Sequence, residues 1–221
     1  EIENGTILKG TITSDVTLAA GNTYKLSGEY IVEEGATLHI EEGVKIIAVY
    51  DDIADYILVK QGGKINAVGT PDKPIVMTSE KEEPGAWGGI HICGRAHTNA
   101  EGGKGSSEIG GNDDADNSGT LQYIRLEYTG FAFDEEHEAN GISFYGIGNG
   151  TIVDHCQAYK GSDDGFEFFG GSVNVSNLVA VSCSDDSFDW TEGWNGKGTN
   201  LVAYQEDKST LGYDCDCLME C

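Results

Sequence analysis

The sequence predicts an all-β fold in which short strands stack in parallel, rung upon rung, as a solenoid. Three observations predict it: segments that recur every 22 to 27 residues or so, short β-branched stretches that alternate apolar and polar side chains, and Gly, Asn and Asp residues between those stretches. No window shows the period of about 3.6 residues that an amphipathic helix requires. Leucine-rich repeats have a similar spacing, but their Leu-dense consensus is absent. We therefore expect each rung to hold two or three short strands joined by tight turns.

The rungs can be followed along the chain. The first 30 residues are expected to form an N-terminal cap and the first strands of a single domain that spans residues 1–221. An acidic, Gly-rich loop is expected over residues 95–119. A spacing that drifts along the chain is typical of rungs that differ in loop length. The repeat is carried by three pairs of segments: 32–38 with 59–65, 161–167 with 183–189, and 176–181 with 199–204.

The same alternation predicts the core. Phe166 and Phe188 occupy equivalent positions in successive repeats, so their rings are expected to stack. The other expected core residues are Leu38, Ile40, Ile46, Ile65, Ile90, Leu126, Ala158, Leu178, Ala180 and Leu201.

The charge balance excludes several classes of partner. The chain has 38 Asp and Glu residues against 13 Lys and Arg residues, a formal net charge of −25. A field of that sign repels the phosphates of nucleic acids and of anionic membrane surfaces. No run approaches the roughly 18 apolar residues of a membrane span, and Glu1 opens a segment typical of a mature chain. The surplus of carboxylates favours bound cations.

Six cysteines are an unusual number for a chain of 221 residues. No CxxC pair and no paired histidines accompany them, so disulfides of an exported protein are expected rather than a zinc site. Cys215 or Cys217 is expected to pair, with Cys221 or Cys183 as candidate partners. Cys93 and Cys156 are expected to remain reduced as small apolar side chains.

Acidic turns recur in consecutive repeats and form the leading candidate metal site. Asp163 and Asp164 are equivalent to Asp185 and Asp186, and Glu167 is equivalent to Asp189. Stacking brings these like charges close together, which costs energy unless protons are retained or a cation bridges them. Dense carboxylate oxygens suit Ca²⁺. In the alternative interpretation these aspartates only cap turn amides and face solvent.

A second candidate calcium site lies in the loop. Asp114, Asp116 and Ser118, followed by Gly119, match the first positions of an EF-hand loop, but Arg125 stands where its closing Glu belongs. A distant carboxylate, Glu108 or Glu138, would have to complete the shell. The alternative is a plain flexible loop.

The aromatic residues after the acidic turns have two interpretations. Phe168 and Phe169 are expected in the core. Trp190 and Trp194 are either core residues or a platform for sugar rings beside the acids.

Three segments carry a resemblance to known proteins: GATLHI at 35–40, GTPDKPIVMTS at 69–79 and WGGI at 87–90. They resemble right-handed parallel β-helix proteins of the pectate-lyase type. The GAWGGI at 85–90 and the DDGFE at 163–167 also resemble a group of exported or surface lipoproteins of Gram-negative bacteria. The resemblance covers most of residues 30–221. It implies an extracellular or outer-membrane location, and further rungs beyond Cys221.

Two classes of function follow. The first is an exported, surface-associated binding or structural module, stabilised by Ca²⁺, with polysaccharides or other cell-surface components as partners. The alternative is a polysaccharide lyase or glycoside hydrolase that uses the stacked carboxylates. The hydrolases that the chain resembles also carry a His and an Arg–Lys pair near the acids. Here the nearest histidine is His155, and Arg95 and Arg125 are the only arginines, so the balance favours a binding module.

Overall fold

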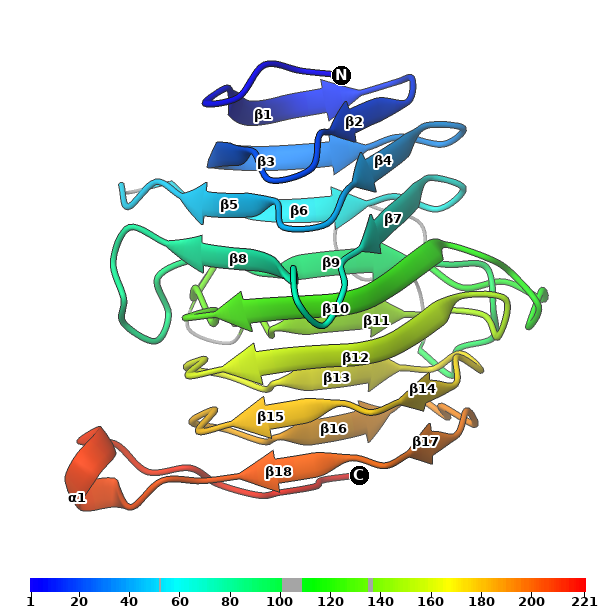
Figure 1. Ribbon diagram of the computed structural model, residues 1–221. Helices are drawn as coiled ribbons and strands as arrows, with labels where there is room; N and C mark the ends of the chain where they lie inside the picture. The colour runs from blue at the N-terminus through cyan, green and yellow to red at the C-terminus, as the bar shows by residue number, and fades with distance from the viewer. Residues whose placement is uncertain (52, 101–108, 135–136) are drawn as a thin grey trace.

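The computed structural model describes residues 1–51, 53–100, 109–134 and 137–221, and it is a right-handed parallel β-helix (Figure 1). The predicted all-β class is confirmed. Every pairing between its named strands is parallel, as expected when equivalent segments of successive rungs lie side by side.

The strands form three sides of the solenoid. The first side contains β2 (Val16–Leu18), β4 (Thr37–Ile40), β7 (Lys64–Val68), β14 (Val175–Ser176) and β17 (Gly198–Thr199). The second contains β5 (Lys45–Ala48), β8 (Ile75–Ser79), β15 (Val179–Val181) and β18 (Val202–Tyr204). The third contains β6 (Tyr56–Val59), β9 (Ile90–Cys93), β11 (Ile142–Tyr145), β13 (Phe166–Phe169) and β16 (Phe188–Thr191). Four longer strands bend from one side to the next: β1 (Ile7–Ile12), β3 (Thr23–Val32), β10 (Gly119–Glu127) and β12 (Ile152–Tyr159).

The core fills the space between the three sides. Of the predicted core residues, all are buried except Leu201, which is partly buried against the same core. The predicted stack of Phe166 on Phe188 is confirmed, with 5.5 Å between ring centroids and nearly parallel planes. Phe144 and Phe168 make a second stack at 4.9 Å. These ring pairs lie on adjacent strands of the third side, so they fix how β11, β13 and β16 align.

The predicted repeat length holds at both ends of the solenoid but is too short for its middle. Leu38 pairs with Ile65, and Phe166 with Phe188, at the expected spacing. Ile65, however, pairs next with Gly119, because the chain has a long insertion between β9 and β10. Extra length in a solenoid is accommodated in loops, since the stacked strands cannot change their register.

The predicted disulfides are absent from the structure. All six cysteines lie in the described part of the chain, and no disulfide is formed among them. Cys93, Cys156 and Cys183 are buried, and burial raises the pKa of both Cys156 and Cys183 to about 12. Because burial disfavours the thiolate, Cys156 and Cys183 pack as small, largely apolar groups.

Thiol titration checks this correction. The protein, denatured without reductant, is expected to release six titratable thiols. Four or fewer would show that a disulfide forms and would restore the original expectation. A matched sample reduced before denaturation gives the reference value.

The chain ends in a segment that adds a partial layer to the third side. It follows the short helix α1 (Lys208–Leu211). Among the described residues, no helix is long and apolar enough to cross a membrane. The Ser187 N–H donates to the carbonyl of Cys217, and the Glu220 N–H donates to the carbonyl of Phe188. The C-terminal segment thereby lies against β16, next to the acidic turns (Figure 1).

Candidate metal-binding site

One outward-facing row of side chains on the third side changes from apolar to acidic along the solenoid. Leu58, His91, Ser143, Glu167 and Asp189 are register partners on β6, β9, β11, β13 and β16. The row therefore begins apolar and ends acidic. Leu58, His91 and Ser143 are buried although they face away from the core.

The burial of this row has an identifiable cause. Residues 131–134 and 137–139 lie against each other, and the Phe133 N–H donates to the carbonyl of His137. The Phe133 ring then packs edge-on against Tyr56 at 5.5 Å and against His91 at 5.9 Å. The sequence contained no sign of this cover, because a loop that packs over a sheet has no periodic pattern.

The acidic turns come together as the repeat predicted. Glu167 pairs with Asp189 in register. Asp163, Asp164 and Asp185 form one group, and Asp164, Glu167 and Asp189 form another; within each group the ligand oxygens lie within 4.8 Å of one another. Asp164 belongs to both groups. We call these five residues the acidic cluster.

The electrostatics of the acidic cluster are unfavourable for free carboxylates. Burial, followed by the charges of neighbouring carboxylates, raises the pKa of Asp164 to about 9 and that of Asp163 to about 7. Burial also raises the pKa of Glu167 to about 8, and Asp189 adds to this shift. No ion pair among the described residues includes a member of the cluster. The cluster must hold protons or a cation, since like charges this close repel strongly in a buried site.

Two of the aspartates cap turn amides, as the alternative interpretation supposed, but both are buried and do not face solvent. Asp164 Oδ1 accepts from the Asp186 N–H at 2.9 Å, and Asp186 Oδ1 accepts from the Cys217 N–H at 2.8 Å. Each aspartate therefore holds the turn of the rung that follows it. A carboxylate has two oxygens, so capping leaves one of them for a cation.

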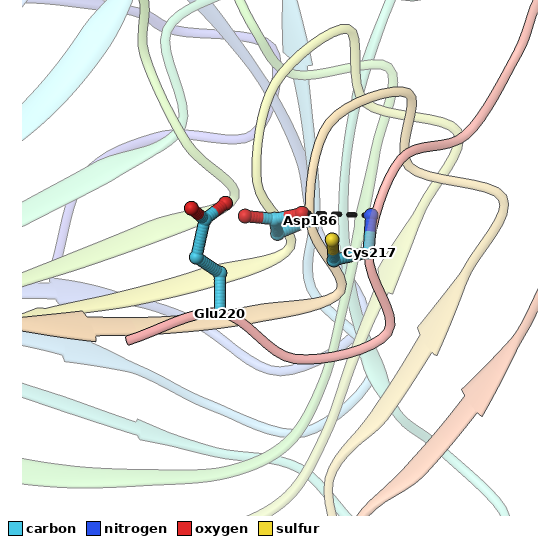
Figure 2. Close-up of side chains that lie close together, drawn as sticks. All are labelled: Asp186, Cys217 and Glu220. Carbon is cyan, nitrogen blue, oxygen red and sulfur yellow. Dashed lines mark hydrogen bonds between the residues drawn. The ribbon is translucent and has the colours of Figure 1, made fainter.

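A third group involves the chain's end. Figure 2 shows Asp186 between Cys217 and Glu220, with the Glu220 carboxyl facing that of Asp186 and the Cys217 amide bonded to Asp186. A hydrogen bond in which the protonated Glu220 donates to Asp186 raises the pKa of Glu220. Cys217 and Glu220 had no repeat motif to mark them, so the sequence analysis did not include them.

Asn140 is the other residue that sequence reasoning missed. It immediately precedes Gly141 and β11, and it is 2% exposed. Its Nδ2 donates to Glu167 Oε2 at 2.6 Å and to Ser143 Oγ at 2.9 Å. Its Oδ1 has no hydrogen-bond partner among the described residues.

Comparison with known proteins agrees with this architecture. A sequence model of the pectate-lyase-like β-helix domain matches residues 10–220, nearly the whole chain. The chain belongs to this family. No curated protein and no solved structure matches it. Membership in the pectate-lyase-like family accounts for the stacked parallel strands, and the site itself must indicate the role of this β-helix domain.

The second predicted calcium site of this pectate-lyase-like domain is not assembled as expected. Asp114 Oδ1 accepts from the His97 N–H and contacts His97 Nδ1 at 2.8 Å, which raises the pKa of His97. Asp116 Oδ2 accepts from the Arg95 N–H at 2.7 Å. Neither aspartate belongs to any described group of three metal-ligating side chains. Both hold backbone N–H groups of the loop, and Ca²⁺ binding by this loop stays a prediction.

Ser118 and Glu138, the described members of the rest of that predicted shell, make other contacts. Ser118 is buried, and its N–H donates to Thr151 Oγ1. Glu108 lies outside the described residues. The charge of Glu138 acts instead on Asp163, whose pKa it helps to raise, so this glutamate borders the acidic cluster.

The two tryptophans lie against the core of the β-helix. Trp194 stacks on Phe168 at 4.7 Å, and its Nε1 donates to the carbonyl of Val173. Trp190 is the register partner of Phe168 and is also partly buried. Phe168 and Phe169 are buried, as expected. Sugar contact by the exposed parts of Trp190 and Trp194 stays a prediction.

Proposed function

We propose that this pectate-lyase-like β-helix domain is a binding or structural module of an exported, surface-associated protein, stabilised by Ca²⁺ at the acidic cluster. The observation that carries the proposal is the convergence of five carboxylates that no described lysine, arginine or histidine neutralises. Buried charges that lack a partner are costly, so a bound cation explains why the fold retains them.

The ligand chemistry favours Ca²⁺ over softer metals. The acidic cluster offers carboxylate oxygens alone, whereas zinc and copper sites use imidazole or thiolate ligands. Ca²⁺ accepts several hard oxygens in a flexible geometry. A stack of rungs supplies that flexibility, because Asp163 and Asp185, or Glu167 and Asp189, come from different turns of the solenoid.

The proposed partners are polysaccharides or other cell-surface components. The partly exposed Trp190 and Trp194 lie close after the acidic turns in sequence, and aromatic rings of this kind suit the apolar faces of sugars. The strongly acidic chain would itself repel uronate-rich chains, so neutral glycans or Ca²⁺-bridged acidic ones are the favoured ligands.

A binding assay tests the proposal. The protein is expected to co-sediment with insoluble polysaccharides when Ca²⁺ is present and less so in EDTA, without releasing reducing ends or unsaturated products. Isothermal titration with CaCl₂ should show binding in the absence of any glycan. If CaCl₂ produces no binding heat and no polysaccharide is retained, the proposal is wrong.

One observation keeps an enzyme as the second candidate. Glu167 hydrogen-bonds its neighbour Asp189 and has a pKa raised to about 8, so it could serve as a general acid beside a carboxylate. Turnover of a polysaccharide in the same assay, abolished in Glu167→Gln, would favour this candidate over the binding module.

A further inference from the structure

Two buried side-chain oxygens among the described residues lack a hydrogen-bond partner: Asn140 Oδ1 and Ser187 Oγ. Both residues adjoin the acidic turns. Ser187 directly follows Asp186, and the Gly141 N–H beside Asn140 donates to the carbonyl of Asp164 at 2.9 Å. Native proteins leave very few buried polar groups unpaired, because each costs about 1–3 kcal/mol. Two unpaired buried oxygens next to the acidic turns therefore indicate that a partner is missing at the acidic cluster.

The amide of Asn140 cannot be satisfied by the chain alone. As placed, its nitrogen donates to Glu167 Oε2 and Ser143 Oγ, and its oxygen faces no donor. Exchanging nitrogen and oxygen would set the amide oxygen 2.6 Å from a carboxylate oxygen of Glu167 and would leave the nitrogen unpaired instead. As placed, the amide oxygen therefore has no donor; in the exchanged orientation it could be bonded by Glu167 only if that carboxyl carried the proton.

The adjacent carboxylates have the spacing of a calcium shell. Ca²⁺ binds oxygens at about 2.3–2.6 Å, so two ligands of one ion lie at most about 5 Å apart. The ligand oxygens of Asp164, Glu167 and Asp189 lie within 4.8 Å of one another. Asn140 is hydrogen-bonded to one of the three, and Ca²⁺ accepts amide oxygens as well as carboxylates.

We infer that Asn140 Oδ1 is the neutral oxygen ligand of a Ca²⁺ ion held by Asp164, Glu167 and Asp189, either directly or through a water molecule on the ion. The inference rests on the proposed Ca²⁺ binding and deepens it. It assigns the ion to the group that contains Glu167 rather than to Asp163 and Asp185, and it gives the buried, unpaired amide its missing partner.

Two substitutions at one position test the inference by titration with CaCl₂. Asn140→Ala removes the oxygen and is expected to weaken Ca²⁺ binding about tenfold or more, as the loss of a supporting ligand does at other metal sites. Asn140→Asp keeps the shape and adds a charge. It is expected to bind Ca²⁺ more tightly than the wild type, and to melt at a lower temperature in EDTA because a further carboxylate then lies beside Glu167.

Gln61→Ala is the matched control. In the wild type, the Gln61 amide nitrogen donates to the carbonyls of Gly94 and Gly110 at 2.8 Å. The variant therefore also loses two hydrogen bonds, but at the turn between β6 and β7. This variant is expected to lose stability equally in Ca²⁺ and in EDTA, with its Ca²⁺ affinity unchanged.

The outcomes distinguish a failure of the ligand role of Asn140 from a failure of the proposed function on which it rests. No Ca²⁺ binding by the wild type would refute the proposed function. Wild-type binding that Asn140→Ala leaves unchanged would overturn only the ligand role, and would mean that an ordinary buried water satisfies Oδ1. Should Asn140→Ala fail to fold, Asn140→Asp decides, because unchanged or weaker binding by this variant overturns the inference.

Discussion

In EDTA, the melting temperature of the protein is expected to fall steadily as the pH rises from about 5 to about 9. The folded chain holds protons on Asp163, Asp164 and Glu167, whose pKa values lie at about 7, 9 and 8. In the unfolded chain these carboxyls titrate near pH 4. A carboxyl whose pKa is raised by folding contributes stability that is complete below its unfolded pKa and is lost as the pH rises through its folded pKa. For each proton that only the folded state retains, the free energy of unfolding falls by about 1.4 kcal/mol for every unit by which the pH rises.

A single substitution identifies the source of this slope. Asp164→Asn keeps an oxygen to accept from the Asp186 N–H but removes the ionisable group, so the fall should become shallower. Asp72→Asn, at an exposed turn, is the control for net charge and should retain the wild-type slope. Measurement at about 0.5 M NaCl screens the acidic surface. A melting temperature that stays level or rises across this interval would show that the acidic cluster holds no protons.

Millimolar Ca²⁺ at pH 8 is expected to raise the melting temperature well above that in NaCl of equal ionic strength. An ion that binds only the folded state adds about 2.7 kcal/mol at 100 times its dissociation constant. The effect should be largest above neutral pH, because a cation competes with protons for the same oxygens. Differential scanning fluorimetry or calorimetry in CaCl₂, NaCl and EDTA measures it.

Two variants with the same capping role separate metal binding from turn structure. Asp164 and Asp186 each accept from one backbone N–H of the following rung, but only Asp164 belongs to the acidic cluster. Asp164→Asn is therefore expected to abolish most of the Ca²⁺ response, and Asp186→Asn to retain it. Identical melting curves for the wild type in CaCl₂ and NaCl would mean that the acidic turns are capping structures only.

The sequence predicted those parts of the molecule that repeat. The stack of Phe166 on Phe188, the pairing of Glu167 with Asp189 and the buried aliphatic side chains all follow from equivalent positions one rung apart. In a parallel solenoid, equivalent positions become neighbours, so periodicity alone locates such contacts.

The parts that do not repeat could not be predicted in the same way. Asn140 and Glu138 reach the acidic cluster from a loop, and Glu220 reaches the neighbouring Asp186 from a segment after α1. Their positions depend on how these segments pack, which no periodic pattern records. Asp114 and Asp116 were marked by a partial motif, and the structure shows their side chains accepting from the backbone N–H groups of His97 and Arg95.

The parallel pairing of all the named strands also affects the rate at which the chain folds. Parallel neighbours cannot be joined by a tight hairpin, so no two strands can form a local nucleus. A long loop must close before each rung contributes contacts, which makes folding slow. Docking of β16 on β13 brings Glu167 against Asp189 in the same step. The barrier to that step therefore includes carboxylate repulsion, and protons or Ca²⁺ would control its height.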